Sequence, residues 1–84
     1  MNAKNLNTSL SPRGLALHPH VLAIAVRHNC IAEFQGDLRH LGPKNMGGYR
    51  IIDGNGKLVA GENFHLKADD VFVHFGEPVP EVSL

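Results

Sequence analysis

Residues 49–60 have the sequence YRIIDGNGKLVA, and this stretch decides the fold. Its two ends, YRIID and KLVA, are rich in the branched and aromatic residues that favour β-strands. Between them lie Gly54, Asn55 and Gly56, residues that tolerate the positive φ angles of tight turns. The pattern therefore predicts a β-hairpin with its turn at these three residues.

The segment after the hairpin is compatible with two structures. A turn is expected at residues 61–63, and the apolar segment FHLKADDVFVHFG follows at residues 64–76. As a helix, it places Asp69 and Asp70 at the positive end of the helix dipole and ends at Gly76. As a strand, it adds a third member to a β-meander. We favour a short helix, whose apolar face consists of Val71, Phe72 and Phe75.

Upstream of the hairpin, the pattern predicts a helix followed by a short strand. Pro19 suits a first helical position, and apolar residues recur on one helical face up to Val26. Asn29 is expected to end this helix, because asparagine adopts a left-handed backbone more readily than most residues. The next residues, CIAEF at 30–34, alternate as a strand does, and a helix that continues to Phe34 is the alternative.

A glycine-rich connection joins this strand to the hairpin. In the connection, Asp37 is expected to cap a single helical turn at residues 38–41. The chain thus forms a single α+β domain at residues 13–76. A mobile arm poor in apolar residues is predicted at 1–12, and an extended tail with two prolines at 77–84.

Length and composition limit the class of protein. A chain of 84 residues with 43% hydrophobic residues has room for one domain but not for two. It has no Trp, four Phe and one Tyr, so its core is small, and oligomerisation would add buried apolar surface. Eight basic and eight acidic residues give a net charge of zero, which argues against a nucleic-acid or membrane-surface binder that uses the whole chain.

The single cysteine, Cys30, has no internal disulfide partner, and a reducing cytoplasm is the expected location. The first 14 residues contain no continuous apolar segment, so we expect no secretory signal. The most apolar stretch, LALHPHVLAIAV at 15–26, is too short to span a bilayer, and we expect no membrane partner.

The stretch from Gly47 to Val71, GGYRIIDGNGKLVAGENFHLKADDV, resembles small uncharacterised bacterial proteins. The shared features are a Gly-Gly-Tyr start, a hairpin with turn glycines and a Leu-x-x-Asp-Asp-Val helix start. The resemblance implies the same hairpin and helix and a bacterial or mobile-element origin. It implies no activity.

Six histidines raise the possibility of a metal site, because imidazole is a common ligand for zinc, copper and nickel. The pairs His18/His20 and His28/Cys30 are possible half-sites, but a structural zinc site needs four ligands in closely spaced pairs. Binding of a metal through histidines is therefore the third functional hypothesis.

No complete catalytic or phosphate-binding motif is present. The segment DGNGK at 53–57 resembles fragments of two ligand loops. A P-loop requires Ser or Thr where Leu58 stands, and an EF-hand that begins at Asp53 requires Glu where Phe64 stands. We therefore expect neither an enzyme nor a cofactor.

The charge is distributed unevenly along the chain. Residues 38–52 contain three basic residues and no acid, whereas residues 53–84 contain two lysines and six acids. A basic, glycine-rich loop can bind phosphate, single-stranded nucleic acid or an acidic protein surface. The alternative is a solvated loop that faces the acidic segment of the same chain. The candidate residues for binding an anion or a partner are Arg39, His40, Lys44, Tyr49 and Arg50.

The sequence thus favours a small non-enzymatic interaction protein, a protein–protein adaptor or inhibitor, with a protein partner or a second copy of itself. An exposed apolar surface at Val71, Phe72 and Phe75 is the predicted contact. Binding of nucleic acid or another anionic ligand through residues 39–50 is the alternative.

Overall fold

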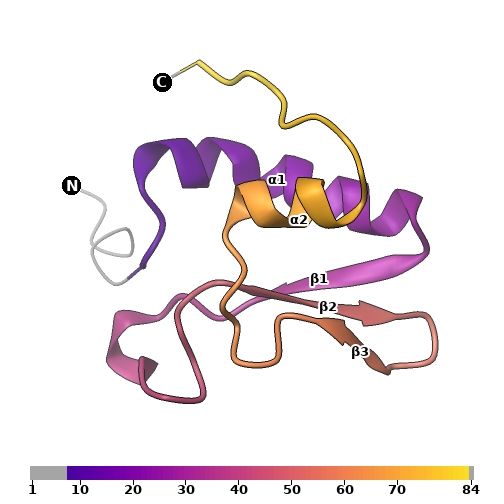
Figure 1. The fold of residues 1–84 in the computed structure, drawn as a ribbon. Helices are drawn as coiled ribbons and strands as arrows, with labels where there is room; N and C mark the ends of the chain where they lie inside the picture. Colours follow the sequence, from indigo (N-terminus) through magenta and orange to yellow (C-terminus); the bar gives the residue numbers. More distant parts are fainter. Residues whose placement is uncertain (1–7, 84) are drawn as a thin grey trace.

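The computed structural model describes residues 8–83, which form two layers. One layer is a three-stranded antiparallel sheet in the order β1-β2-β3. The strands are β1 (Cys30–Phe34), β2 (Tyr49–Asp53) and β3 (Leu58–Ala60). The helices are α1 (Pro12–Arg27), α2 (Ala68–His74) and a short 3₁₀ helix, η2 (Leu38–His40). Figure 1 shows α1 and α2 on the same side of the sheet. The predicted α+β class is confirmed.

Helix α1 begins seven residues earlier than the sequence pattern predicted, at Pro12 rather than at Pro19. The side chain of Ser11 caps it by accepting a hydrogen bond of 3.1 Å from the backbone N–H of Gly14. Pro19 lies inside the helix, where it removes one backbone hydrogen bond. The helix continues because Leu17 and Val21, on either side of Pro19, are buried in the core.

The helix ends where the sequence indicated, since Asn29 has a φ of 60°. Strand β1 follows at once and pairs with β2 from Cys30 opposite Asp53 to Phe34 opposite Tyr49. The alternative of a helix continuing to Phe34 is therefore wrong. In η2, the Asp37 side chain accepts a hydrogen bond from the backbone N–H of Arg39, as predicted for a capped turn.

The hairpin between β2 and β3 is confirmed. The Asp53 carboxylate organises its turn by accepting hydrogen bonds from the backbone N–H groups of Asn55 (2.8 Å) and Lys57 (3.0 Å). Gly56 has a φ of 79°, whereas Gly54 is not among the residues with positive φ. A bulge shifts the pairing between Ile51 and Ile52.

The segment after the hairpin forms a helix, α2, and not a third meander strand. The Asp70 carboxylate caps its start by accepting a hydrogen bond of 2.9 Å from the backbone N–H of Lys67. Gly76, with a φ of 71°, ends the turn that follows the helix. Residues 77–83 have no regular secondary structure.

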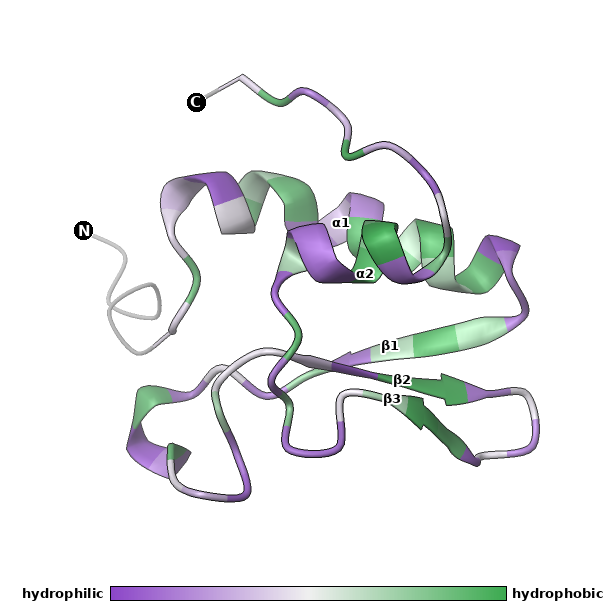
Figure 2. Cartoon of the chain, in the orientation of Figure 1, coloured by the Kyte–Doolittle hydropathy of each residue, from purple (hydrophilic) through white to green (hydrophobic). Residues whose placement is uncertain are grey.

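The core lies between the two layers, and every member is apolar or aromatic. Figure 2 shows hydrophobic residues in both layers. Helix α1 packs against β1 and α2, and α2 also contacts β2. The buried residues are Leu17, Val21, Ile24, Ala25, Ala32, Tyr49, Ile51, Ala68, Val71 and Phe72.

The predicted arm at residues 1–12 differs from the structure where the chain is described. Residues 1–7 lie outside the described residues. Thr8 forms a β-bridge with Asp37, and the backbone N–H of Ser9 donates a hydrogen bond of 2.8 Å to the carbonyl of Gly36. Pro12 belongs to α1. Among residues 8–83, no helix is long and apolar enough to cross a bilayer.

Candidate functional site

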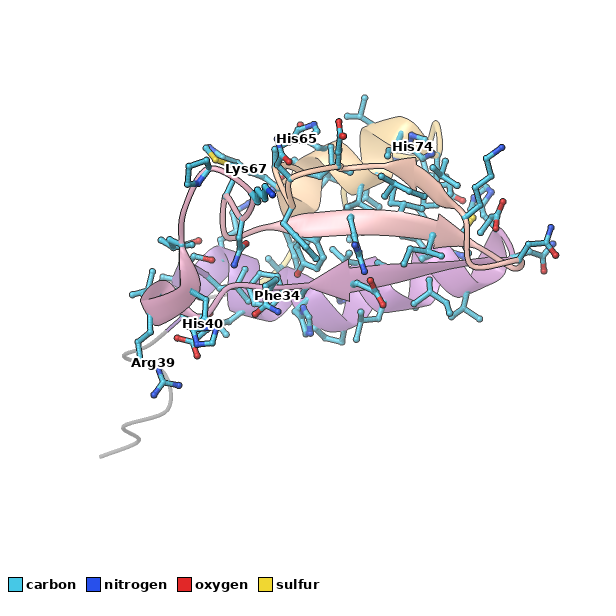
Figure 3. The ribbon with its side chains drawn as sticks, turned by 90° about the horizontal axis from the view of Figure 1, so that it is seen from below. Phe34, Arg39, His40, His65, Lys67 and His74 are labelled. Carbon is cyan, nitrogen blue, oxygen red and sulfur yellow. The ribbon has the colours of Figure 1, made fainter. Side chains whose placement is uncertain are left out.

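The five residues of the predicted basic site do not form one surface. Arg39, His40 and Lys44 lie on the exposed loop around η2. Figure 3 shows Arg39 and His40 at this loop, apart from His65 and Lys67 near the start of α2. Tyr49 and Arg50 belong to β2, and their side chains point to opposite faces of the sheet.

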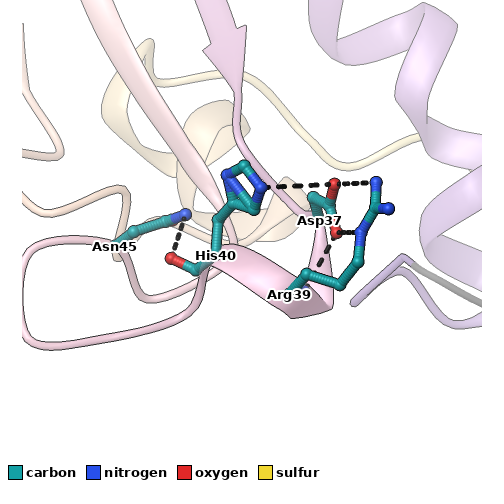
Figure 4. A network of polar contacts seen from close by, with 4 residues as sticks. All are labelled: Asp37, Arg39, His40 and Asn45. Atoms are coloured by element: carbon teal, nitrogen blue, oxygen red, sulfur yellow. Dashed lines mark hydrogen bonds and ion pairs between the residues drawn. The ribbon is translucent and has the colours of Figure 1, made fainter.

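The basic loop is partly neutralised by a neighbouring carboxylate, as Figure 4 shows. The Nε and Nη2 atoms of Arg39 donate hydrogen bonds of 3.0 and 2.7 Å to Asp37. His40 Nε2 lies 3.9 Å from the same carboxylate. The hydrogen bonds from Arg39 hold the pKa of Asp37 well below its usual range, and Asp37 in turn raises the pKa of Arg39. A ligand anion would have to compete with Asp37 for this guanidinium.

Tyr49 is not available to any partner, because its side chain is fully buried. Its hydroxyl forms a hydrogen bond of 2.7 Å with Nδ1 of His18, and its ring lies 4.9 Å from that of Phe34. Burial raises the pKa of Tyr49 to about 12. The prediction that Tyr49 is an exposed binding residue is therefore wrong, because the pleat of β2 directs it into the core together with Ile51.

The predicted apolar contact surface is also buried. Val71 is fully buried and Phe72 is 3% exposed, so both belong to the core. Phe75 is half-buried and stacks on the His28 ring, with the ring centroids 4.5 Å apart. The apolar face of α2 was identified correctly, but it faces α1 and the sheet and not the solvent.

Exposed apolar side chains occur in both layers, among them Val26 and Val73 on the helices. One group of them lies on the face of the sheet that carries no helix, which we name the outer sheet face. Cross-strand pairing places Ile31 beside Ile52, and Ile52 beside Leu58, so that an apolar row crosses all three strands. Ile31 is 56% exposed and Leu58 is 42% exposed. The sequence analysis did not propose these residues as a site. The alternation of side chains along β1 could have indicated Ile31, because Ile31 lies on the opposite face of the strand from Ala32.

A charged pair lies next to this row. Glu33 and Arg50 are cross-strand partners, and Arg50 Nε donates a hydrogen bond of 2.5 Å to Glu33 Oε1. The guanidinium of Arg50 also lies over the Phe64 ring, 4.8 Å from its centroid. Arg50 is thus a residue of the outer sheet face and not of the basic loop.

A cleft of about 480 Å³ opens between the start of α1, residues 46–49 and residues 65–70. Its acids already have partners, because Asp69 pairs with Arg13 at 2.7 Å and Asp70 caps Lys67. The hydroxyl of Ser9 is bonded to the Gly47 carbonyl. These contacts stabilise the meeting point of the two helix starts.

The histidines do not gather into a metal centre within residues 8–83, where no group of three or more potential ligands occurs. His18 and His20 are two residues apart on α1 and so point in different directions. His18 is bonded to Tyr49, and His28 Nε2 lies 2.6 Å from a Glu77 carboxylate oxygen. Cys30, the other predicted half-site ligand, is a half-buried free thiol.

Comparison of the chain with protein-family models, curated proteins and solved structures gives no significant match.

Proposed function

We propose that this protein is a non-enzymatic interaction protein that forms a homodimer through its outer sheet face. One observation carries the proposal: the row of Ile31, Ile52 and Leu58 crosses all three strands on the side that α1 and α2 leave uncovered. Contiguous apolar surface of this kind is typical of protein contacts, and its burial is favourable.

The charges on this face favour a second copy as the partner. A two-fold interface brings the same surface of both copies together, so it must be complementary to itself. Glu33 and Arg50 lie side by side next to the apolar row, and a two-fold axis can place each beside its opposite in the other copy. The chain as a whole has a net charge of zero, so identical copies do not repel each other at long range.

The alternative of an anion-binding loop has less support. Arg39 is paired with Asp37 and Arg50 with Glu33, and His40 also faces Asp37, which leaves Lys44 as the remaining candidate. Nucleic-acid binding through this loop stays a prediction from the sequence. The cytoplasm remains the location we propose, because the half-buried thiol of Cys30 needs no oxidising compartment.

The test is the mass of the protein in solution, measured by light scattering and sedimentation over a range of concentrations. Ile31→Lys places a charge in the apolar row, and each copy then loses one aliphatic side chain from the dimer interface. Burial of such a side chain contributes about 1.5 kcal/mol, so the loss from both copies weakens the dimer about a hundredfold. Val73→Lys is the matched control, because Val73 is 72% exposed on α2, in the other layer.

The expected result is a dimer for the wild type and the Val73 variant and a monomer for the Ile31 variant. Thermal unfolding of both variants checks that they are folded. A wild-type protein that stays monomeric at high concentration, or an Ile31 variant that dimerises as the wild type does, would contradict the proposal.

A further inference from the structure

The tail, residues 77–83, runs along the helical layer on the side away from the sheet, as Figure 1 shows in yellow. It leaves α2 at Gly76, whose positive φ turns the chain back. The tail is held at its first residue and at two valines. Val79 and Val82 are half-buried and pack against the core.

The first of these contacts is electrostatic. Glu77 accepts a hydrogen bond of 2.9 Å from Arg27 Nη2, and its other carboxylate oxygen lies 2.6 Å from His28 Nε2. Both partners come from the end of α1, where cations are expected to collect. The His28 ring also stacks on Phe75, so that the receiving surface is built from both helices.

The second contact is apolar and depends on spacing. An extended, proline-rich segment completes a turn about every three residues, so residues three apart point to the same side. Val79 and Val82 have this spacing, and Pro78 and Pro80 favour the extended course. In this tail, the contact is thus made by one carboxylate followed by two branched apolar residues on one side of the chain.

Few contacts besides these hold the tail. No backbone–backbone hydrogen bond joins residues 78–83 to the rest of the described chain. The charged contacts are solvent-exposed, with Arg27 62% and Glu77 35% exposed, and exposed ion pairs hold a segment weakly. Removal of the tail uncovers apolar surface of the helical layer, which then needs another apolar occupant.

We propose that the surface under the tail is a peptide-binding site, and that the tail fills it in place of a segment from another protein. The ligand is an extended, proline-containing peptide with a carboxylate two residues before the first of two branched apolar residues that are three apart. The tail acts as a built-in competitor. This site lies in the helical layer, so it does not depend on the proposed dimer of the outer sheet face.

The experiment measures binding of a synthetic peptide, EPVPEVS, with the sequence of residues 77–83, to the full-length protein by NMR titration. In the Glu77→Gln protein, the tail loses the charge that strengthens its contacts with Arg27 and His28, so the site is open more often. This variant should bind the peptide about fivefold more tightly than the wild type does. The Glu81→Gln protein is the matched control, because Glu81 is exposed and takes part in none of the ion pairs found in residues 8–83, and should bind as the wild type does.

Peptide variants test the same site without any change to the protein. Against the Glu77→Gln protein, a peptide with E77Q should lose most of its affinity, whereas a peptide with E81Q should keep it. When Arg27→Gln is added to the protein, the affinity for the unchanged peptide should fall by about as much as the E77Q change in the peptide lowers it. Thermal unfolding confirms that each protein variant is folded.

Three outcomes would overturn the proposal. In the first, the Glu77→Gln and Glu81→Gln proteins bind the peptide equally. In the second, the E77Q and E81Q peptides bind equally. In the third, Glu77→Gln converts a wild-type dimer to a monomer while Ile31→Lys does not, which would mean that tails are exchanged between copies and that the site serves assembly.

Discussion

Tyr49 provides a sharp test of the core, because it was predicted to be an exposed binding residue and is instead fully buried. Burial raises its pKa to about 12 in the folded protein, from 10.0 for the free side chain. The folded state therefore holds the phenolic proton more tightly than the unfolded state does. The resulting stabilisation is fully present below pH 10 and is lost as the pH rises through about 12.

The size of this loss follows from the two values. Each unit of pKa difference corresponds to about 1.4 kcal/mol, so the wild type should lose about 1.4 kcal/mol of its free energy of unfolding by pH 11. Tyr49→Phe removes the titrating group together with the hydrogen bond to His18, which costs about 1 kcal/mol at neutral pH. The variant should therefore be less stable than the wild type at pH 8 and about equally stable at pH 11.

The assay is urea unfolding of both proteins at the two pH values, because the lysines titrate equally in both and cancel in the comparison. The chain contains one Tyr and no Trp, so the near-ultraviolet absorbance of tyrosinate reports on Tyr49 alone. Its titration in the folded wild type should be shifted upward relative to that in urea. A midpoint near that of free tyrosine, or parallel loss of stability in both proteins, would refute the burial of this side chain.

Two further predictions concern glycines. Gly56→Val should cost about 1–2 kcal/mol because of its positive φ, whereas Gly54→Val should cost under about 0.5 kcal/mol, and equal melting temperatures for the two would contradict the observed turn. Gly48→Ala should lower the free energy of unfolding by at least about 2 kcal/mol, because the new Cβ would lie 2.2 Å from the Leu66 carbonyl oxygen. Gly42→Ala is the control, because its new Cβ would have no atom within 4 Å. Chemical unfolding compares the two variants, and equal stability would contradict the close approach at Gly48.

The local signals in the sequence predicted most of the elements. The hairpin followed from two strand-like runs around DGNG, and α2 followed from its paired acids and Gly76. The start of α1 was missed because the sequence pattern assigned Pro12 to the arm and Pro19 to the first helical position. Ser11 before Pro12 is a stronger cap than His18 before Pro19, and the structure uses Ser11. A proline within a helix is tolerated here because buried residues surround it.

The candidate site was predicted less well, because charge counted along the chain ignores pairs formed across it. The window from 38 to 52 contains no acid, yet Asp37 and Glu33 lie just before it and fold back on Arg39 and Arg50. The alternation of β2 would have placed Tyr49 and Ile51 on one face and Arg50 on the other. A count of charges over consecutive residues does not distinguish side chains on the two faces of a strand.

The two sides of the molecule differ in what covers them. The described core contains only apolar and aromatic residues, and a chain of 84 residues cannot leave much of its apolar surface exposed without loss of stability. On the helical side, Val79 and Val82 of the tail add to the core, so a ligand there must first displace the tail. On the sheet side, no described segment covers Ile31 or Leu58. The proposed dimer would cover the apolar row on the sheet side, whereas the proposed peptide would have to displace the tail on the helical side.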